Sequence, residues 1–225
     1  IIRACTGVFK CWVMLKILYL KTVLIYHRHT MTSSPTLSQA LPPSVAAAMW
    51  RADQLGAVAH ATLPSGFDAL DAALPGGGWP CRGLTELLCP QAGVLEWRLL
   101  GPALRAQTAG RKADRPADRK ARVMLVAPPW PPHAPGLKSM GIDERRLVWI
   151  DASAPAERLW VVEQLLRARS PGCVLAWLPD ARAGQLRRLQ VLAGQAGADR
   201  GPVFIFRGRA AAHESSPAPL RVLAW

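Results

Sequence analysis

The sequence predicts an α/β protein whose strands form a mostly parallel sheet covered by helices on both faces. Two observations lead to this fold class. Short runs of almost uniformly apolar residues recur along the chain, and amphipathic helical patterns separate most of them. Uniformly apolar strands are typical of parallel sheets, because the crossover helices cover both faces and leave neither exposed to water.

The elements can be placed in order along the chain. We expect a helix over 45–60 and then a short helix with Phe67, Leu70 and Leu74 on one face, ended by the Pro75–Gly78 run. The first strand is expected at 84–88, followed by a helix from about Leu95. Later strands are expected at 123–127, 147–150, 173–178, 203–206 and 221–225. Two further helices are expected, one with Leu159, Val162 and Leu166 on one face and one with Leu186, Leu189 and Ala193 on one face.

The first thirty residues differ in composition from the rest of the chain. Residues 1–30 hold five basic residues and no acid. Their apolar stretch is interrupted by Lys16 and Lys21, each costing about 2.5–3.5 kcal/mol at a bilayer centre, which argues against a membrane span. We expect residues 1–30 to be upstream sequence, 31–44 a disordered N-terminal stretch, and 45–225 the folded domain, truncated at its C-terminal end.

Charge and cysteine content limit the class of protein. The formal net charge of +13 favours nucleic acid or acidic partners, and part of it comes from a basic loop at 110–122. The five cysteines are odd in number and form no C-x-x-C pair. We therefore expect reduced thiols in a cytoplasmic protein and no metal site. No G-x-S-x-G motif is present, and neither Ser65 nor Cys89 has an evident His partner for nucleophilic catalysis.

A proline-rich loop, APPWPPHAP at 127–135, follows the expected second strand of the sheet. Ligands of α/β proteins usually bind at the carboxyl ends of such strands. The loop offers one His and one Trp but no carboxylate, so it is a weak candidate for catalysis.

Residues 63–90, LPSGFDALDAALPGGGWPCRGLTELLCP, resemble the start of the RecA recombinase core. They resemble still more closely the RecA-like ImuA family, also called the SulA/ImuA group. The resemblance runs from about Trp50 to Trp225 and includes LVAPPWPPHAPGL, GID, RLVWI, VVEQLLR, VLAWLPD and LRRLQ. It implies a RecA-like, parallel-rich sheet flanked by helices on both faces.

The resemblance also implies a degenerate phosphate loop. A working loop needs glycines, a Lys for the outer phosphates and a Ser or Thr for magnesium. The positions that correspond to it are Cys89, Pro90, Gln91, Gly93, Val94, Leu95 and Glu96. Leu95 stands in the place of the lysine and Glu96 in the place of the hydroxyl, so a carboxylate faces the site where phosphate would lie.

Two further positions depart from the RecA pattern in the same direction. Pro129 stands near the catalytic glutamate position, and Trp177 stands at the Walker B position, which would present a magnesium-orienting aspartate. Asp180 is the nearest carboxylate and is expected to cap the following helix. No ATPase activity and no cofactor are therefore expected.

By this resemblance the chain is a non-catalytic adaptor in SOS-induced translesion DNA synthesis and damage-induced mutagenesis. The implied partners are RecA, a Y-family-polymerase-like protein and an error-prone DNA polymerase, with DNA contacted weakly or indirectly and no membrane involved. Candidate surface residues for contact with an acidic partner are Arg187, Arg188, Arg207 and Arg209.

Three alternatives remain open from the sequence. A SulA-like inhibitor of cell division belongs to the same group, and sequence chemistry does not separate it from the adaptor. A DNA-dependent ATPase would need a nucleotide affinity that Leu95 and Glu96 argue against. A plain nucleic-acid-binding module, based on the basic surplus, predicts a steep salt dependence and aromatic stacking positions.

Overall fold

The computed structural model describes residues 61–93, 95–109, 121–168, 172–195 and 200–223, all of which lie in the unit Ala61–Trp225. The segments expected at 1–30 and 31–44 and the helix expected over 45–60 lie outside the described residues. The same holds for Val94 and for residues 110–120 of the basic loop.

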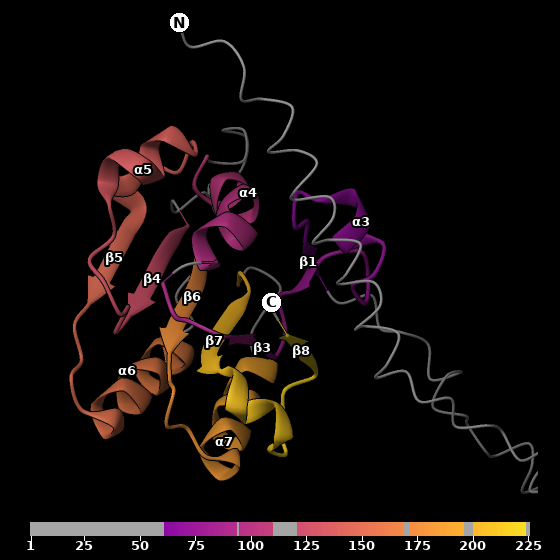
Figure 1. Ribbon diagram of the computed structural model, residues 1–225, viewed down its shortest axis with the longest axis vertical. Coiled ribbons are helices and arrows are strands. Elements are labelled where there is room, and N and C mark those ends of the chain that lie inside the picture. Colours follow the sequence, from indigo (N-terminus) through magenta and orange to yellow (C-terminus); the bar gives the residue numbers. More distant parts are fainter. Residues whose placement is uncertain (1–60, 94, 110–120, 169–171, 196–199, 224–225) are drawn as a thin grey trace, which may run out of the picture. The chain divides into compact units, whose positions relative to one another are not determined.

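Six strands form one sheet in the order β5-β4-β6-β7-β3-β8, and every neighbouring pair is parallel (Figure 1). The strands are β3 (Leu84–Cys89), β4 (Arg122–Val126), β5 (Leu147–Ile150), β6 (Gly172–Trp177), β7 (Val203–Gly208) and β8 (Leu220–Leu223). Each strand predicted from an apolar run is present, and the predicted parallel sheet is confirmed.

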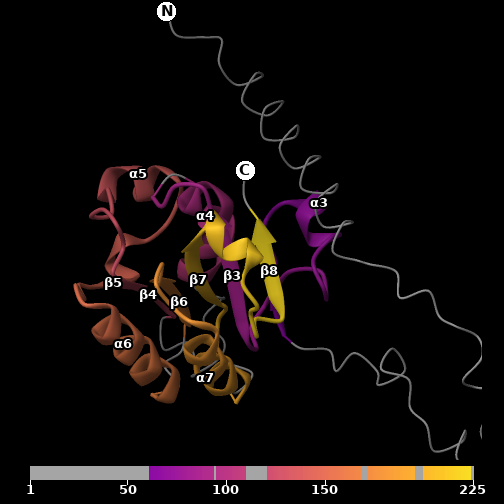
Figure 2. The same cartoon turned by 60° about the horizontal axis from the view of Figure 1, so that its bottom comes forward.

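Helices cover both faces of this sheet, as predicted. The helices are α4 (Glu96–Thr108), α5 (Ala134–Ser139), α6 (Pro155–Arg167) and α7 (Ala183–Gly194), with 3-10 turns η1 (Glu144–Arg146) and η2 (Arg209–His213). Figures 1 and 2 show α4 and α5 on one face and α6 and α7 on the other. The architecture is therefore α/β and consistent with a RecA-like fold.

The core lies between the sheet and its helices. All six residues of β3 and all six of β6 are buried, which is expected for central strands covered on both faces. On one face the core cluster includes Leu84, Val126 and Ile205 from the strands and Val162, Leu166, Leu186 and Leu189 from α6 and α7. On α4, Leu100 and Leu104 are fully buried.

A smaller antiparallel pair precedes the sheet. β1 (Thr62–Leu63) pairs with β2 (Trp79–Pro80), and the short helix α3 (Asp68–Asp71) lies between them in sequence. Trp79 is fully buried, and its ring meets the edge of Phe204 on β7 at a centroid distance of 5.3 Å. This contact ties the segment before the phosphate-loop position to the central sheet.

Because the strands are parallel, the carboxyl ends of all six lie along the same side of the sheet. The loops after β3, β4 and β6 therefore approach one another there, and this carboxyl side holds the candidate site. At the opposite side, Gly172 adopts φ +125° at the start of β6, and a Cβ atom there would lie 1.9 Å from the carbonyl oxygen of Arg122. Only glycine allows the two strands to pair this closely.

None of the helices in the described residues is long and apolar enough to cross a membrane.

Candidate functional site

The phosphate-loop position lies between β3, which ends at Cys89, and α4, which begins at Glu96. Pro90 and Gln91 are exposed, and Gly93 turns the chain with φ +86°. The loop therefore occupies the place that the resemblance predicts, between a buried strand and the N-terminus of a helix. That place is suited to anions because helix N-termini present unpaired N–H groups.

Glu96 supplies an anion to this loop from within the protein. Its side chain is almost completely buried, and its carboxylate accepts three hydrogen bonds. The backbone N–H of Gly93 donates to Oε1 (2.6 Å), the N–H of Leu95 donates to Oε2 (3.0 Å), and the indole Nε1–H of Trp177 donates to Oε1 (3.1 Å). Charge-assisted bonds of this kind are stronger than neutral ones, so the carboxylate satisfies donors that a phosphate would otherwise use.

Leu95 is the N-cap residue of α4 and makes no side-chain capping bond. Its half-buried apolar side chain offers no positive charge to a phosphate. The sequence predicted that the side chain at this position cannot do the work of the lysine. The structure adds a feature that the sequence did not reveal, because the backbone N–H of Leu95 donates directly to Glu96.

Trp177 ends β6 at the Walker B position. Its ring stacks on Phe206 of β7 with a centroid distance of 4.6 Å and an interplanar angle of 22°. Its indole N–H donates to Glu96, so the two residues that the resemblance places at the magnesium-aspartate and hydroxyl positions bond to each other. The sequence predicted a change at each of these positions separately, and the structure shows that the two residues are in direct contact. Asp180 is exposed and does not cap α7, because Arg182 is the N-cap residue, so that prediction was wrong.

Ser65 and Cys89, the nucleophiles considered from the sequence, are both buried. Burial, followed by the nearby negative charge of Glu96, raises the pKa of the Cys89 thiol from its ordinary value of 9.0 to about 12. Burial and then Cys81 raise the pKa of Cys173 in the same direction. Ser65 is buried, and its hydroxyl accepts from the N–H of Phe67 in a local turn. The thiolate is the reactive form of cysteine, so Cys89 and Cys173 are protected from reaction at neutral pH.

A cleft of about 400 Å³ opens beside the loop. Its walls are the loop after β4, the first turn of α4 and the helix α5. It is lined by Gly93, Trp97, Arg98, Pro128, Pro129, Trp130, Pro131, His133, Gly136, Leu137, Ser139, Met140 and Trp177. The proline-rich loop thus forms a cavity wall at the carboxyl side of the sheet, as its position predicted.

The four candidate partner-binding arginines fall into two groups. Arg187 and Arg188 are exposed on α7, and Arg188 pairs with Glu163 of α6 at 2.9 Å. Arg209 is exposed on η2. Arg207, however, is buried on β7, so its prediction as a surface residue was wrong. The strand continues two residues further than the VFIF pattern at 203–206 indicated, and Arg207 points into the interior.

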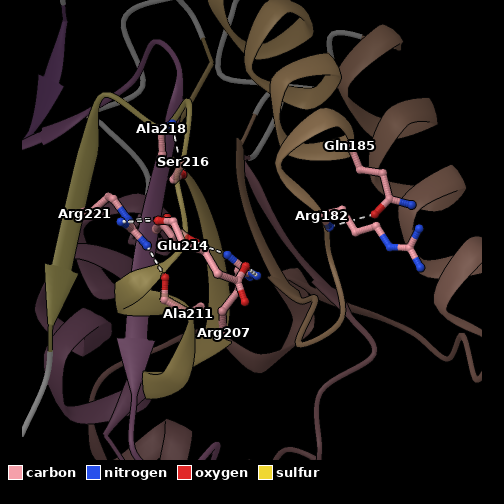
Figure 3. A network of polar contacts seen from close by, with 9 residues as sticks. Arg182, Gln185, Arg207, Ala211, Glu214, Ser216, Ala218 and Arg221 are labelled. Carbon is pink, nitrogen blue, oxygen red and sulfur yellow. Dashed lines mark hydrogen bonds and ion pairs between the residues drawn. The ribbon is translucent and has the colours of Figure 1, made fainter.

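Arg207 belongs to an ionic network with a buried centre, Glu86 and Arg207, that connects η2 to the sheet (Figure 3). Its Nη1 donates to Glu86 of β3 (2.8 Å) and its Nη2 to Glu214 (2.6 Å). Arg221 of β8 donates from Nε to the other oxygen of Glu86 (2.7 Å) and from Nη2 to the carbonyl of Ala211 (2.7 Å). Burial alone lowers the pKa of Arg207, but the hydrogen bonds and charges of Glu86 and Glu214 raise it overall, so the guanidinium stays charged.

This network was missed from the sequence. Glu86 interrupts an otherwise apolar strand, LTELLC, and a charge in a buried strand requires an opposite charge beside it. That requirement was the available signal, because the predicted strands included one that contains Arg221 and one, at 203–206, that ends just before Arg207. No cluster of three or more possible metal ligands occurs within the part of the chain that the structure describes.

Together, the fold and the site define an α/β protein with a RecA-like sheet in which an internal glutamate occupies the phosphate-loop position. No protein-family model matches the sequence, and no curated protein matches it. Among solved structures, the chain is similar to SulA from Pseudomonas aeruginosa, with 21% identity and a TM-score of 0.42 over 55% of this chain and 98% of that chain. A similarity at this level assigns neither fold nor function.

Proposed function

We propose that this chain is a non-catalytic, RecA-like adaptor in SOS-induced translesion DNA synthesis. In this role it links RecA, a Y-family-polymerase-like protein and an error-prone DNA polymerase. The family resemblance of residues 50–225 supplies these partners, and the geometry of the phosphate-loop position supports the absence of catalysis.

One observation carries the non-catalytic part of the proposal. The carboxylate of Glu96 takes the N–H groups of Gly93 and Leu95 at the start of α4. A nucleotide would have to displace this buried carboxylate and would meet no lysine to offset the charge of its phosphates. Phosphoryl transfer depends almost entirely on such positioning and charge stabilisation, so neither tight binding nor hydrolysis of ATP is expected.

An adaptor needs surfaces rather than a nucleotide switch. Arg187 and Arg188 on α7 and Arg209 on η2 are exposed and offer positive charge to an acidic partner. Charge reversal at such positions weakens binding by roughly 1–3 kcal/mol if the pair is desolvated, and by much less at the rim of an interface. Arg207 is left out of this set because it lies inside the protein.

The nucleotide test is a titration of the purified full chain with a fluorescent ATP analogue and magnesium. No binding at micromolar nucleotide is the expected result. Micromolar or tighter binding would exclude the non-catalytic reading and favour the DNA-dependent ATPase.

The cellular test measures ultraviolet-induced resistance mutations in a strain that lacks the gene. Mutation frequency should fall in the deletion strain and recover with the wild-type gene, while ordinary recombination continues. Arg187→Glu, Arg188→Glu and Arg209→Glu are then compared with Leu95→Ala, which should complement fully because docking does not use the phosphate-loop position. Unchanged mutagenesis in the deletion strain, together with failure to divide on overexpression, would favour a SulA-like inhibitor of cell division.

A further inference from the structure

The cleft beside the phosphate-loop position has a wall of indole and proline rings. Trp130, which is 69% exposed, and Trp177, which is buried, both line it. The pyrrole edge of Trp130 lies against Gly93, because a Cβ atom on Gly93 would be 2.8 Å from Cδ1 and 3.3 Å from Nε1. A ring held by one edge and exposed to this extent keeps a flat face open for stacking.

The wall that holds Trp130 is rigid before any ligand binds. Ala127 turns the chain with φ +49°, and Pro128, Pro129 and Pro131 fix the backbone on either side of the indole. A preformed wall loses little conformational entropy when a ligand binds, which favours affinity.

The charged groups that line the cleft are basic. Among the described residues that line it, Arg98 and His133 are the ionisable ones and none is acidic. Nδ1 of His133 accepts the N–H of Gly136 at 3.2 Å, so in its neutral form the ring carries its proton on Nε2 and can donate it to a ligand. The lining therefore suits a planar group with an anionic oxygen beside it.

We propose that this cleft binds an unstacked base of a single-stranded nucleic acid, with Trp130 as the stacking partner and Arg98 and His133 as contacts for an adjoining phosphate. Stacking on an exposed aromatic ring next to basic residues is the usual way in which proteins hold single strands without reading sequence. The cleft volume of about 400 Å³ lies in the range of ligand pockets. The inference goes beyond the proposed adaptor function and does not rest on it.

Two other occupants fit the cleft less well. A nucleoside triphosphate needs the loop N–H groups that Glu96 already takes. A proline-rich peptide needs indole N–H groups to fix its carbonyls, but Nε1 of Trp177 donates to Glu96 and the Nε1 edge of Trp130 faces Gly93. Base stacking uses ring faces and requires neither N–H group.

The test is fluorescence anisotropy of the full chain with a short fluorescein-labelled oligothymidylate. Trp130→Ala should weaken binding roughly 5- to 100-fold, whereas Trp130→Phe should retain most of it because a flat ring remains. Trp160→Ala is the matched control, since Trp160 is 60% exposed on α6, which covers the opposite face of the sheet from α4. Its affinity should stay within about twofold of the wild type, because removing a ring outside the cleft removes no stacking.

Salt dependence gives a second, independent readout. Arg98→Gln should reduce the slope of log K against log salt by about 1, because one phosphate contact is lost. Arg167→Gln, an exposed arginine of α6, should leave the slope unchanged. Absence of oligonucleotide binding, or equal effects of Trp130→Ala and Trp160→Ala, would overturn the proposal. Trp130-dependent binding of a proline-rich peptide without oligonucleotide binding would make the cleft a protein-docking site instead.

Discussion

The indole N–H of Trp177 donates to the carboxylate of Glu96 across 3.1 Å, although the two residues are 81 positions apart in the chain. One ends a central strand and the other begins the helix at the phosphate-loop position. Both side chains are buried, so the bond is shielded from water and contributes to stability as well as to the shape of the site. The loop between β3 and α4 is therefore joined to β6 by a buried hydrogen bond.

Breaking this contact should destabilise the protein. We expect Trp177→Phe and Glu96→Leu each to lower the free energy of unfolding by about 1–3 kcal/mol. Trp177→Phe removes a buried hydrogen bond to a charged group, and Glu96→Leu leaves three donors without their acceptor. The double variant should be less destabilised than the sum of the two, with a coupling of about 0.5–3 kcal/mol. Urea unfolding of the four proteins measures the cycle. Additive effects would mean that the bond contributes nothing to stability.

The Glu86 network should respond more strongly than a surface ion pair. Glu86→Ala leaves the buried guanidinium of Arg207 without its main partner, and we expect a loss of about 3–5 kcal/mol in unfolding free energy. Glu163→Ala removes the pairings with Arg188 and Arg167, whose side chains are 62% and 53% exposed, and should cost about 0–1 kcal/mol. Thermal and urea unfolding compare the two. Equal losses of unfolding free energy in the two variants would contradict the expectation that the buried Glu86 network stabilises the protein more than a surface ion pair does.

Hydropathy patterns were enough to predict the sheet and its helices, because each buried parallel strand must be apolar on both faces. The presence of α6 and α7, but not their limits, was predicted from residues such as Val162 and Leu189, which repeat at helical spacing and are buried as expected. The strand order β5-β4-β6-β7-β3-β8 was not predicted. It depends on contacts between residues far apart in the chain, which local patterns do not encode.

At the site, the sequence indicated which positions depart from the RecA pattern, but not which of these residues contact one another. Leu95, Glu96 and Trp177 were each interpreted against a family pattern, and nothing in that pattern says that Glu96 accepts a bond from Trp177. Arg207 was misplaced for a related reason. An arginine at the end of an apolar strand is usually solvated, and only the pairing of β7 with β3 places it beside Glu86.

Cys89 should make the protein sensitive to alkaline pH. Its thiol has a pKa of about 12 in the folded protein against an ordinary value of 9.0. Between these values the unfolded chain releases the proton while the folded protein keeps it, so the contribution to stability is complete below pH 9 and falls as pH rises toward 12. Unfolding free energy measured from pH 8 upward should therefore decline more steeply in the wild type than in Cys89→Ala. Parallel curves would contradict the raised pKa.

The last prediction concerns the carboxylate that occupies the phosphate-loop position. Leu95→Lys alone should not create nucleotide binding, because the new ammonium would pair with Glu96 while the carboxylate still takes the N–H groups of Gly93 and Leu95. Adding Glu96→Ser removes the carboxylate, frees these donors and supplies a hydroxyl, which together restore the lysine and hydroxyl functions of a phosphate loop.

We expect magnesium ADP to raise the thermal midpoint of the Leu95→Lys, Glu96→Ser variant and to leave the wild type and Leu95→Lys unchanged. A dissociation constant of about 1 mM would give roughly 1.4 kcal/mol of stabilisation at about 10 mM ligand. Hydrolysis of ATP should still be absent, because Pro129 and Trp177 provide no carboxylate for the water or the metal. If ADP stabilises none of the three proteins, the internal carboxylate is not the main obstacle to nucleotide binding, and the geometry of the loop itself must exclude phosphate.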